Sequence, residues 1–213
     1  MQPLKAIIFD LGGVILNIDY NKTSAAFKAA GVKNIDEMYS QKVANQLFED
    51  LETGKVTQTQ FYDEIRNSGM VELTNQQIKK AWDAMLLDFR EETLLFIASL
   101  KSKYKIFLLS NTNSIHLSRF YEIYDSMKRQ STFESLFDEI YYSHLIGARK
   151  PDLAAYQYVI DRNNLNAGEC LFIDDSIQNI EGARLAGLNA IQLTSEMKVE
   201  ELDFDYLQEA RKN

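Results

Sequence analysis

Apolar residues in this chain gather in short runs that alternate with segments of helical periodicity. Five runs are predicted to be strands: Ala6–Phe9, Lys105–Leu109, Glu139–Tyr142, Cys170–Ile173 and Ala190–Leu193. Three segments are predicted to be helices: Glu91–Ser102, Leu153–Arg162 and Ile177–Ala186. Continuous apolar runs that alternate with helices are typical of a parallel sheet covered on both faces. The pattern therefore predicts an α/β fold.

The stretch between the first two strands differs, because Asn17–Leu87 has helical periodicity and no clear strand. Four helices are predicted there: Asp19–Ala30, Ile35–Leu51, Thr57–Ser68 and Thr74–Leu87. Thr57 and Thr74 are predicted N-caps, a position that favours threonine. We therefore expect a helical insert, residues 17–87, over the carboxyl edge of a core built from residues 1–16 and 88–213. The polar tail, Glu200–Asn213, is predicted to be a surface helix or a frayed end.

Composition limits the classes of protein to which this chain can belong. With 213 residues, 46% of them hydrophobic, the chain can form one globular domain with a small insert. A net charge of −8 argues against binding nucleic acid, which requires a basic face. No apolar run is long enough to cross a bilayer, so no membrane association is expected. The single cysteine, Cys170, excludes an internal disulfide, which fits a reducing compartment, and we expect a cytoplasmic protein. We also expect a monomer or a weak homodimer.

Asp10 ends the first apolar run, and Gly12 and Gly13 follow it closely. Open α/β sheets bind their ligands at the carboxyl ends of the strands, where this carboxylate lies. An unpaired carboxylate is costly there, so a metal ion or a covalent role is a natural reason for it. A turn-forming or capping aspartate is an equally common alternative.

Two weaker motifs also follow apolar runs. Ser110 and Asn111 offer a hydroxyl and exposed backbone N–H groups, which together can bind an anion. Taken alone, they are more simply explained by capping of the next helix. Lys150 precedes Pro151 and can point at a phosphate or a carboxylate, although a surface lysine is the commoner explanation.

Asp174 and Asp175 form the strongest single motif, because two adjacent carboxylates end an apolar strand. Like charges this close repel each other, and a bound cation is the simplest remedy. The alternative is an N-cap aspartate beside a solvated one.

Together, in chain order, these motifs resemble the haloacid dehalogenase (HAD) superfamily. The matching stretches are Asp-Leu-Gly-Gly-Val at 10–14, Ser-Asn-Thr-Asn at 110–113, Arg-Lys-Pro at 149–151, Asp-Asp at 174–175 and Asn-Ile-Glu-Gly-Ala at 179–183. The resemblance implies a Rossmann-like parallel sheet core, with residues 17–87 as an inserted α-helical bundle cap. Within the superfamily, the chain is most similar to bacterial phosphatases of sugar phosphates, of the α-glucose-1-phosphatase kind.

The resemblance also implies a role for each motif residue. Asp10 is expected to be the nucleophile that forms an aspartyl-phosphate. Ser110 and the N–H of Asn111 are expected to hold the phosphoryl oxygens, and Lys150 to neutralise Asp10 and the phosphoryl group. The implied ligands of Mg²⁺ are Asp10, the carbonyl of Gly12, Asp174 and Asp175. Mg²⁺ prefers such oxygen ligands, and phosphoryl transfer depends mainly on alignment and charge stabilisation.

Gly12 departs from the pattern of most phosphatases of this superfamily, which carry an aspartate there as general acid and base. A glycine cannot move a proton, so another group is expected to compensate. Asp19, His116 and His144 are the candidates, with His116 the better placed histidine. A packing or surface role is the commoner one for either histidine.

Three functions remain open. The favoured one is a Mg²⁺-dependent phosphatase of a small phosphorylated metabolite, with a sugar phosphate preferred. A haloacid dehalogenase would also lack the acid at position 12, but it uses no Mg²⁺, which the pair Asp174–Asp175 opposes. A non-catalytic or regulatory relative is the third. Six cap residues are candidates to face the substrate: Tyr20, Phe27, Asn45, Phe48, Glu49 and Glu52.

Overall fold

A five-stranded parallel sheet forms the centre of the protein, in a computed structural model that describes residues 3–39, 46–202 and 204. Its strands, in spatial order, are β5 (Glu139–Tyr142), β4 (Lys105–Ser110), β1 (Ala6–Phe9), β6 (Cys170–Asp174) and β7 (Asn189–Gln192). The predicted α/β fold is confirmed, with strand ends displaced by at most one residue. No helix in the described part of the chain is both long and apolar enough to span a bilayer.

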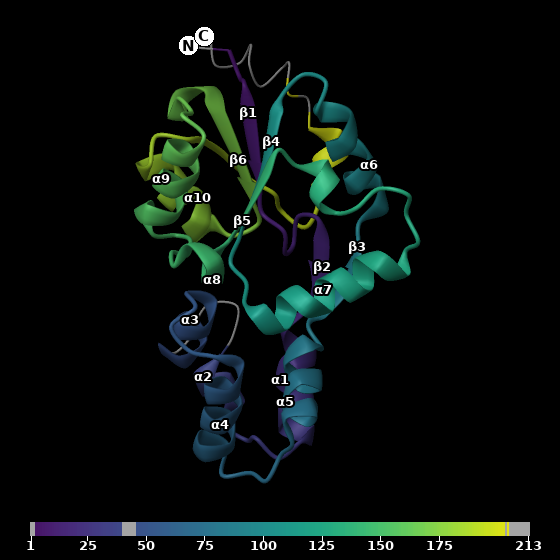
Figure 1. Ribbon diagram of the computed structural model, residues 1–213, viewed down its shortest axis with the longest axis vertical. Helices are drawn as coiled ribbons and strands as arrows, with labels where there is room; N and C mark the ends of the chain where they lie inside the picture. Colours follow the sequence, from purple (N-terminus) through teal and green to yellow (C-terminus); the bar gives the residue numbers. More distant parts are fainter. Residues whose placement is uncertain (1–2, 40–45, 203, 205–213) are drawn as a thin grey trace.

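Side chains of β1 alternate between two apolar layers, because successive residues of a strand point to opposite faces. Ile7 and Phe9 join one layer, and Ala6 and Ile8 join the other. The first layer is completed by α6 (Glu91–Leu100) and α7 (Ser114–Ser126), and the second by α9 (Leu153–Arg162) and α10 (Ile177–Leu185). Figure 1 shows the sheet between these helices.

The strand register brings the predicted motifs to one edge of the sheet. Phe9 pairs with Leu108 of β4 and with Ile173 of β6. Asp10, Ser110 and Asp174 come one or two residues after these pairs, so they lie side by side at the carboxyl edge of the sheet. Short elements complete this core: α8 (Ser143–Ile146) and the 3₁₀ turns Glu134–Leu136, Ala167–Glu169 and Val199–Glu201.

Among the described residues, five helices form a bundle at this edge (Figure 1). They are α1 (Tyr20–Ala29), α2 (Ile35–Met38), α3 (Gln46–Glu52), α4 (Gln58–Gly69) and α5 (Asn75–Asp83). The bundle has its own apolar cluster, which also takes in Ile115 from α7. Thr57 and Thr74 are N-caps as predicted, each with a complete capping box. The bundle is therefore packed internally and also tied to the core.

The single helix predicted over Ile35–Leu51 is wrong. Helix α2 ends at Met38, Tyr39 is extended, and α3 begins at Gln46. The Tyr39 ring packs 4.6 Å from the Phe48 ring and 4.7 Å from the Trp82 ring, measured between centroids. Aromatic packing across the bundle thus competes with helical periodicity along the chain.

Two short strands were also missed. β2 (Leu16–Ile18) and β3 (Leu86–Phe89) pair antiparallel and form both connections between bundle and core. The helix predicted to reach Leu87 ends at Asp83. Strands of three and four residues in a separate two-stranded sheet leave little periodicity to detect. The predicted tail lies mostly outside the described residues.

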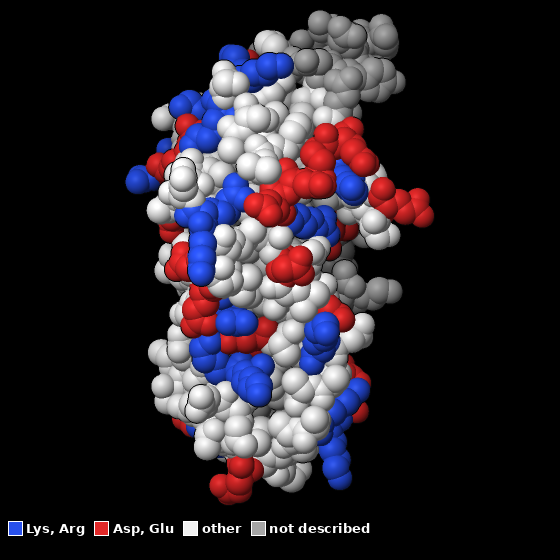
Figure 2. Space-filling model, turned by 90° about the vertical axis from the view of Figure 1, so that its right-hand side faces the viewer, with Lys and Arg blue, Asp and Glu red and all other residues white. Residues whose placement is uncertain are grey.

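Surface charge is mixed on the face that Figure 2 displays. Basic and acidic side chains lie interspersed there over both the core and the bundle. No large patch of one charge covers the described part of this face, whereas Asp10, Lys150 and Asp174 are charged residues buried at the carboxyl edge of the sheet.

Candidate active site

A buried lysine joins two of the predicted aspartates. Lys150 Nζ lies 2.6 Å from Asp10 Oδ1 and 2.7 Å from Asp174 Oδ2. The lysine is 1% exposed and Asp174 is 0% exposed, so these charges meet away from bulk water. Although burial opposes the charge, the two carboxylates hold the pKa of Lys150 above its usual value. Lys150 is thus not the surface lysine that the motif alone would favour.

Asn111 fixes the loop that carries Lys150. Its Nδ2 donates to the Lys150 carbonyl at 2.8 Å, and its Oδ1 accepts from the Lys150 N–H at 2.9 Å. The two residues lie 39 positions apart, so this clamp could not be read from either motif. A side-chain role is therefore added to the backbone role expected of Asn111.

Asp174 is held rigidly by donors on both oxygens. Its Oδ1 accepts from the Ser176 N–H at 2.8 Å, and Asn179 Nδ2 lies 3.0 Å from both Oδ1 and Oδ2. Ser176 and Asn179 belong to the start of α10, which follows β6 directly. The turn between strand and helix therefore orients the carboxylate toward Lys150.

Gly13 makes room for Asp175. Its φ of 73° lies in the left-handed region, and a Cβ there would come within 2.4 Å of Asp175 Oδ2. Gln192 holds Asp175 from the other side by donating to its backbone carbonyl at 3.0 Å. The glycine after the first strand thus permits the close approach of the second acidic motif.

One lysine does not balance the charge of three clustered carboxylates. Oxygens of Asp10, Asp174 and Asp175 all lie within 4.8 Å of one another. Burial raises the pKa of Asp10 to about 8, although Lys150 lowers it. Burial, reinforced by Asp174, raises the pKa of Asp175 to about 6. An all-oxygen cluster with excess negative charge fits a hard divalent cation such as Mg²⁺.

A cavity of about 950 Å³ borders this cluster between the sheet edge and the bundle, and Asp174, which is 0% exposed, is not among its lining residues. The predicted residues that line it are Asp10, Gly12, Ser110, Asn111, Lys150 and Asp175. From the bundle, Tyr20, Glu49 and Glu52 line it as expected. Phe27 and Phe48 do not face the cavity: both are 0% exposed within the bundle's cluster. Asn45 lies outside the described residues.

His116 lines the cavity but is committed to packing. Its ring stacks on Trp82 with centroids 4.5 Å apart, and its Nε2 lies 3.1 Å from the Trp82 carbonyl oxygen. Burial lowers the pKa of His116 to about 4, so the ring is neutral near pH 7. Burial also lowers the pKa of His144, which stacks on Tyr142 in the core.

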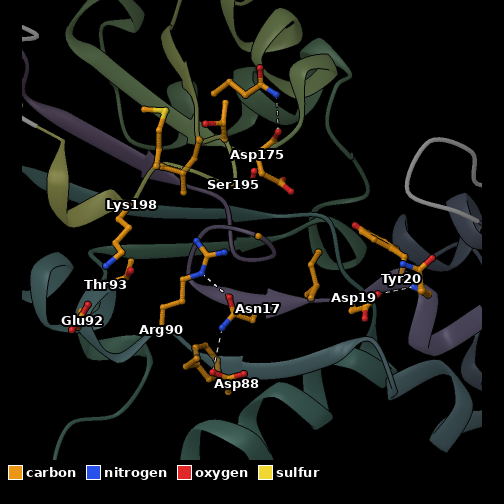
Figure 3. A pocket seen from close by; sticks show the side chains of 18 of the residues that line it. Asn17, Asp19, Tyr20, Asp88, Arg90, Glu92, Thr93, Asp175, Ser195 and Lys198 are labelled. Atoms are coloured by element: carbon orange, nitrogen blue, oxygen red, sulfur yellow. Dashed lines mark hydrogen bonds between the residues drawn. The ribbon is translucent and has the colours of Figure 1, made fainter.

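Asp19 faces a neighbouring cavity that borders the strands β2 and β3 (Figure 3). Its Oδ1 caps α1 by accepting from the Asn21 N–H at 3.0 Å. In the same cavity, Arg90 Nε donates to Asn17 Oδ1 at 2.7 Å, and Asn17 donates to Asp88 at 3.2 Å. These polar contacts secure the two connections between bundle and core.

One ion-pair cluster between bundle and core was not predicted from the sequence. Arg149, next to Lys150, donates from Nε to Glu52 Oε2 at 3.0 Å and from Nη1 to Glu49 Oε1 at 3.1 Å. The side chains of Arg149 and Glu52 are 21% and 11% exposed. Both glutamates belong to α3, so this contact places the bundle directly over the loop of Lys150.

The fold and the site together define a hydrolytic enzyme with a carboxylate centre on a Rossmann-like sheet. The chain belongs to the haloacid dehalogenase-like hydrolase family, whose model matches residues 4–187. The resemblance expected from the motifs is thereby confirmed.

Two curated relatives are phosphatases. The chain is 29% identical to the D-ribitol-5-phosphate phosphatase of Bacteroides thetaiotaomicron over 189 residues, which are 89% of this chain and 91% of that protein. It is 26% identical to the sesquiterpene phosphatase AstK of Aspergillus oryzae, over 91% of each. A HAD-family enzyme of B. thetaiotaomicron, solved with magnesium and inorganic phosphate, superposes with a TM-score of 0.82 at 29% identity and covers 96% of this chain and 98% of its own.

Proposed function

We propose that this protein is a Mg²⁺-dependent phosphatase that hydrolyses a small phosphorylated metabolite, with a sugar or sugar-alcohol phosphate preferred. The observation that carries the proposal is Asp10, a buried carboxylate 2.6 Å from Lys150 and within 4.8 Å of two further aspartates. The relatives that are named phosphatases, one of them a ribitol-5-phosphate phosphatase, support the same reaction.

Asp10 is the proposed nucleophile, which attacks phosphorus and forms an aspartyl-phosphate that water then hydrolyses. Lys150 offsets the charge of Asp10 and of the phosphoryl group, which would otherwise repel each other. Ser110 and the N–H of Asn111 bind the phosphoryl oxygens. Asp10, the Gly12 carbonyl, Asp174 and Asp175 would hold Mg²⁺, which supplies further charge neutralisation when bound.

We propose that residues 17–87 act as a cap over a core of residues 1–16 and 88–213. The cap side of the cavity carries Tyr20, Glu49 and Glu52, with Arg149 facing them from the core. Polar groups of this kind can bind hydroxyls, which suits a sugar-derived leaving group better than a purely apolar one.

A dehalogenase is the second candidate, because the same aspartate can attack a carbon that bears a halogen. The cluster of three carboxylates opposes it, since that reaction requires no divalent cation to hold a phosphoryl group. A non-catalytic relative is opposed by the retained contacts among Asp10, Lys150 and Asp174.

Phosphate release from a panel of sugar phosphates, polyol phosphates, nucleotides and aryl phosphates tests the proposal. Activity should require Mg²⁺ and disappear in EDTA. Asp10→Asn, which keeps the shape but cannot attack phosphorus, should be inactive on every substrate. Full activity in EDTA, or in Asp10→Asn freed of contaminants, would overturn the proposed mechanism.

A further inference from the structure

The position two residues after Asp10 is Gly12, so no side chain there can transfer a proton. Departure of an alcohol from phosphorus requires a proton on the leaving oxygen, and a positioned acid contributes roughly 10²–10⁴-fold to such steps. Unless the leaving group is already a weak base, another acid must lie on the side of the cavity where the alcohol departs.

Most titratable groups near the cavity are unsuited to this task. His116 is neutral near pH 7 and bound to the Trp82 carbonyl, and Asp19 faces the neighbouring cavity. Burial raises the phenol pKa of both Tyr20 and Tyr39. Asp152 is exposed at the start of α9.

Glu52 differs from all of these in its position. It is the last residue of α3 and 8% exposed, and it lines the same cavity as Asp10 from the opposite, cap side. Arg149 holds its Oε2 at 3.0 Å, and the next residue, Lys150, contacts Asp10. One short loop therefore fixes Glu52 relative to the nucleophile.

Gly54 explains how α3 comes this close to the core. Its φ is 71°, and a Cβ would lie 2.4 Å from the carbonyl oxygen of His144, at α8. The turn after Glu52 thus rests directly on the core backbone. This contact and the Arg149 ion pairs fix the end of α3 against the core.

We propose that Glu52 is the general acid and base that Gly12 cannot be. Asp10 attacks phosphorus, the bond from phosphorus to the leaving oxygen breaks, and the Glu52 carboxyl proton passes to that oxygen. The resulting carboxylate then takes a proton from the water that hydrolyses the aspartyl-phosphate, which restores both residues. This inference rests on the proposed phosphatase function.

The charges that face Glu52 are compatible with this role. Burial raises the pKa of Glu52, while Arg149 and, more weakly, Lys150 lower it. Arg149 is shared with Glu49, whose charge raises the pKa again, and Tyr20 and Tyr39 are further neighbours. A carboxyl group in this setting is protonated at a higher pH than a solvated glutamate.

The dependence of kcat on the leaving group distinguishes proton transfer by Glu52 from a role of Glu52 in closing the cap alone. Glu52→Gln should lose about 10²–10⁴-fold in kcat for a polyol phosphate, whose alkoxide is a poor leaving group. With p-nitrophenyl phosphate the first step should be nearly unaffected, and slow hydrolysis of the intermediate should give a burst of nitrophenolate. In the wild type, kcat for the polyol phosphate should fall at alkaline pH as Glu52 loses its proton. This fall should be absent in Glu52→Gln.

Asp50→Asn is the matched control, because Asp50 is an acid of the same helix that pairs with Lys55 at 3.5 Å and does not line the cavity. It should change kcat for both substrates by only a few fold. Glu52→Asp keeps an acid and should recover part of the rate with the polyol phosphate. This variant tests the inference even if Glu52→Gln folds poorly.

Each remaining outcome has a distinct meaning. An equal loss on both substrates in Glu52→Gln, without a burst, would overturn the inference in favour of a purely structural ion pair. An unchanged rate with the polyol phosphate would overturn it as well. If the wild-type protein releases no phosphate from either substrate in Mg²⁺, the proposed function itself fails.

Discussion

Lys150 shows how much chemistry depends on one buried charge. The residue is 1% exposed, and its ammonium group compensates both Asp10 and Asp174. Removing one member of a buried ion pair leaves an uncompensated charge, which typically costs about 3–5 kcal/mol. The role of Lys150 could not be predicted from the Lys-Pro pair alone, because its two partners lie 140 and 24 positions away in the chain.

Lys150→Ala should therefore lose most of its phosphatase activity and, without metal, unfold at a lower urea concentration. The control is Lys105→Ala, which removes an exposed lysine paired with Asp138 at 2.9 Å and should leave kcat/KM unchanged. Urea unfolding and initial-rate kinetics measure the two effects. A wild-type kcat/KM in Lys150→Ala would remove this residue from the mechanism.

Gly13 is a second position where a single atom matters. A methyl group there would overlap Asp175 Oδ2, so Gly13→Ala should displace the carboxylate and weaken Mg²⁺ binding by about 10–100-fold, as the loss of a ligand's support commonly does. Gly147→Ala is the control, with a similar φ of 70° but nothing within 4 Å of its Cβ. Titration of activity with Mg²⁺ measures the shift, and equal Mg²⁺ requirements in the two variants would refute it.

At the scale of elements, the bundle is attached to the core in two different ways. On one side, Ile115 and His116 of α7 pack into the bundle through apolar and aromatic contacts. On the other, α3 meets Arg149 through ion pairs. Polar contacts exchange readily with water, so we expect cap opening to separate α3 from Arg149 while α7 stays in place.

His116 makes the α7 contact sensitive to acid. Its pKa falls from 6.5 to about 4 in the folded protein, so the unfolded chain binds more protons between these values. Its contribution to stability is complete above pH 6.5 and is lost as the pH falls toward 4. The melting temperature of His116→Asn should fall less over this interval than that of the wild type, and equal slopes would contradict the assignment.

Whether an element could be predicted from the sequence depends on how far apart in the chain its contacting residues lie. The strands of the sheet are continuous apolar runs, and their chemistry lies within a few residues of each strand end. The pair β2–β3 and the contact of Glu52 with Arg149 join residues far apart in the chain, the latter by 97 positions. Such pairings depend on how the bundle sits on the core, which no local pattern encodes.

For the whole molecule, parallel topology is what assembles the site. Five strands run in one direction, so motifs spread from Asp10 to Asp175 meet at one edge, and the bundle closes the cavity over them. The family followed from this order of motifs, and the α/β fold followed from the alternation of apolar runs with helical segments. The acid that serves the leaving group did not, because it comes from the inserted bundle.

Formation of an aspartyl-phosphate at position 10 is the most direct test of the account. Rapid quenching during turnover, reduction with borohydride and peptide mass spectrometry would convert a phosphorylated aspartate to homoserine and locate it. We predict homoserine at Asp10, only when substrate and Mg²⁺ are present, and none in Asp10→Asn. Continued phosphate release without homoserine at this position, or with homoserine elsewhere, would contradict the proposed chemistry.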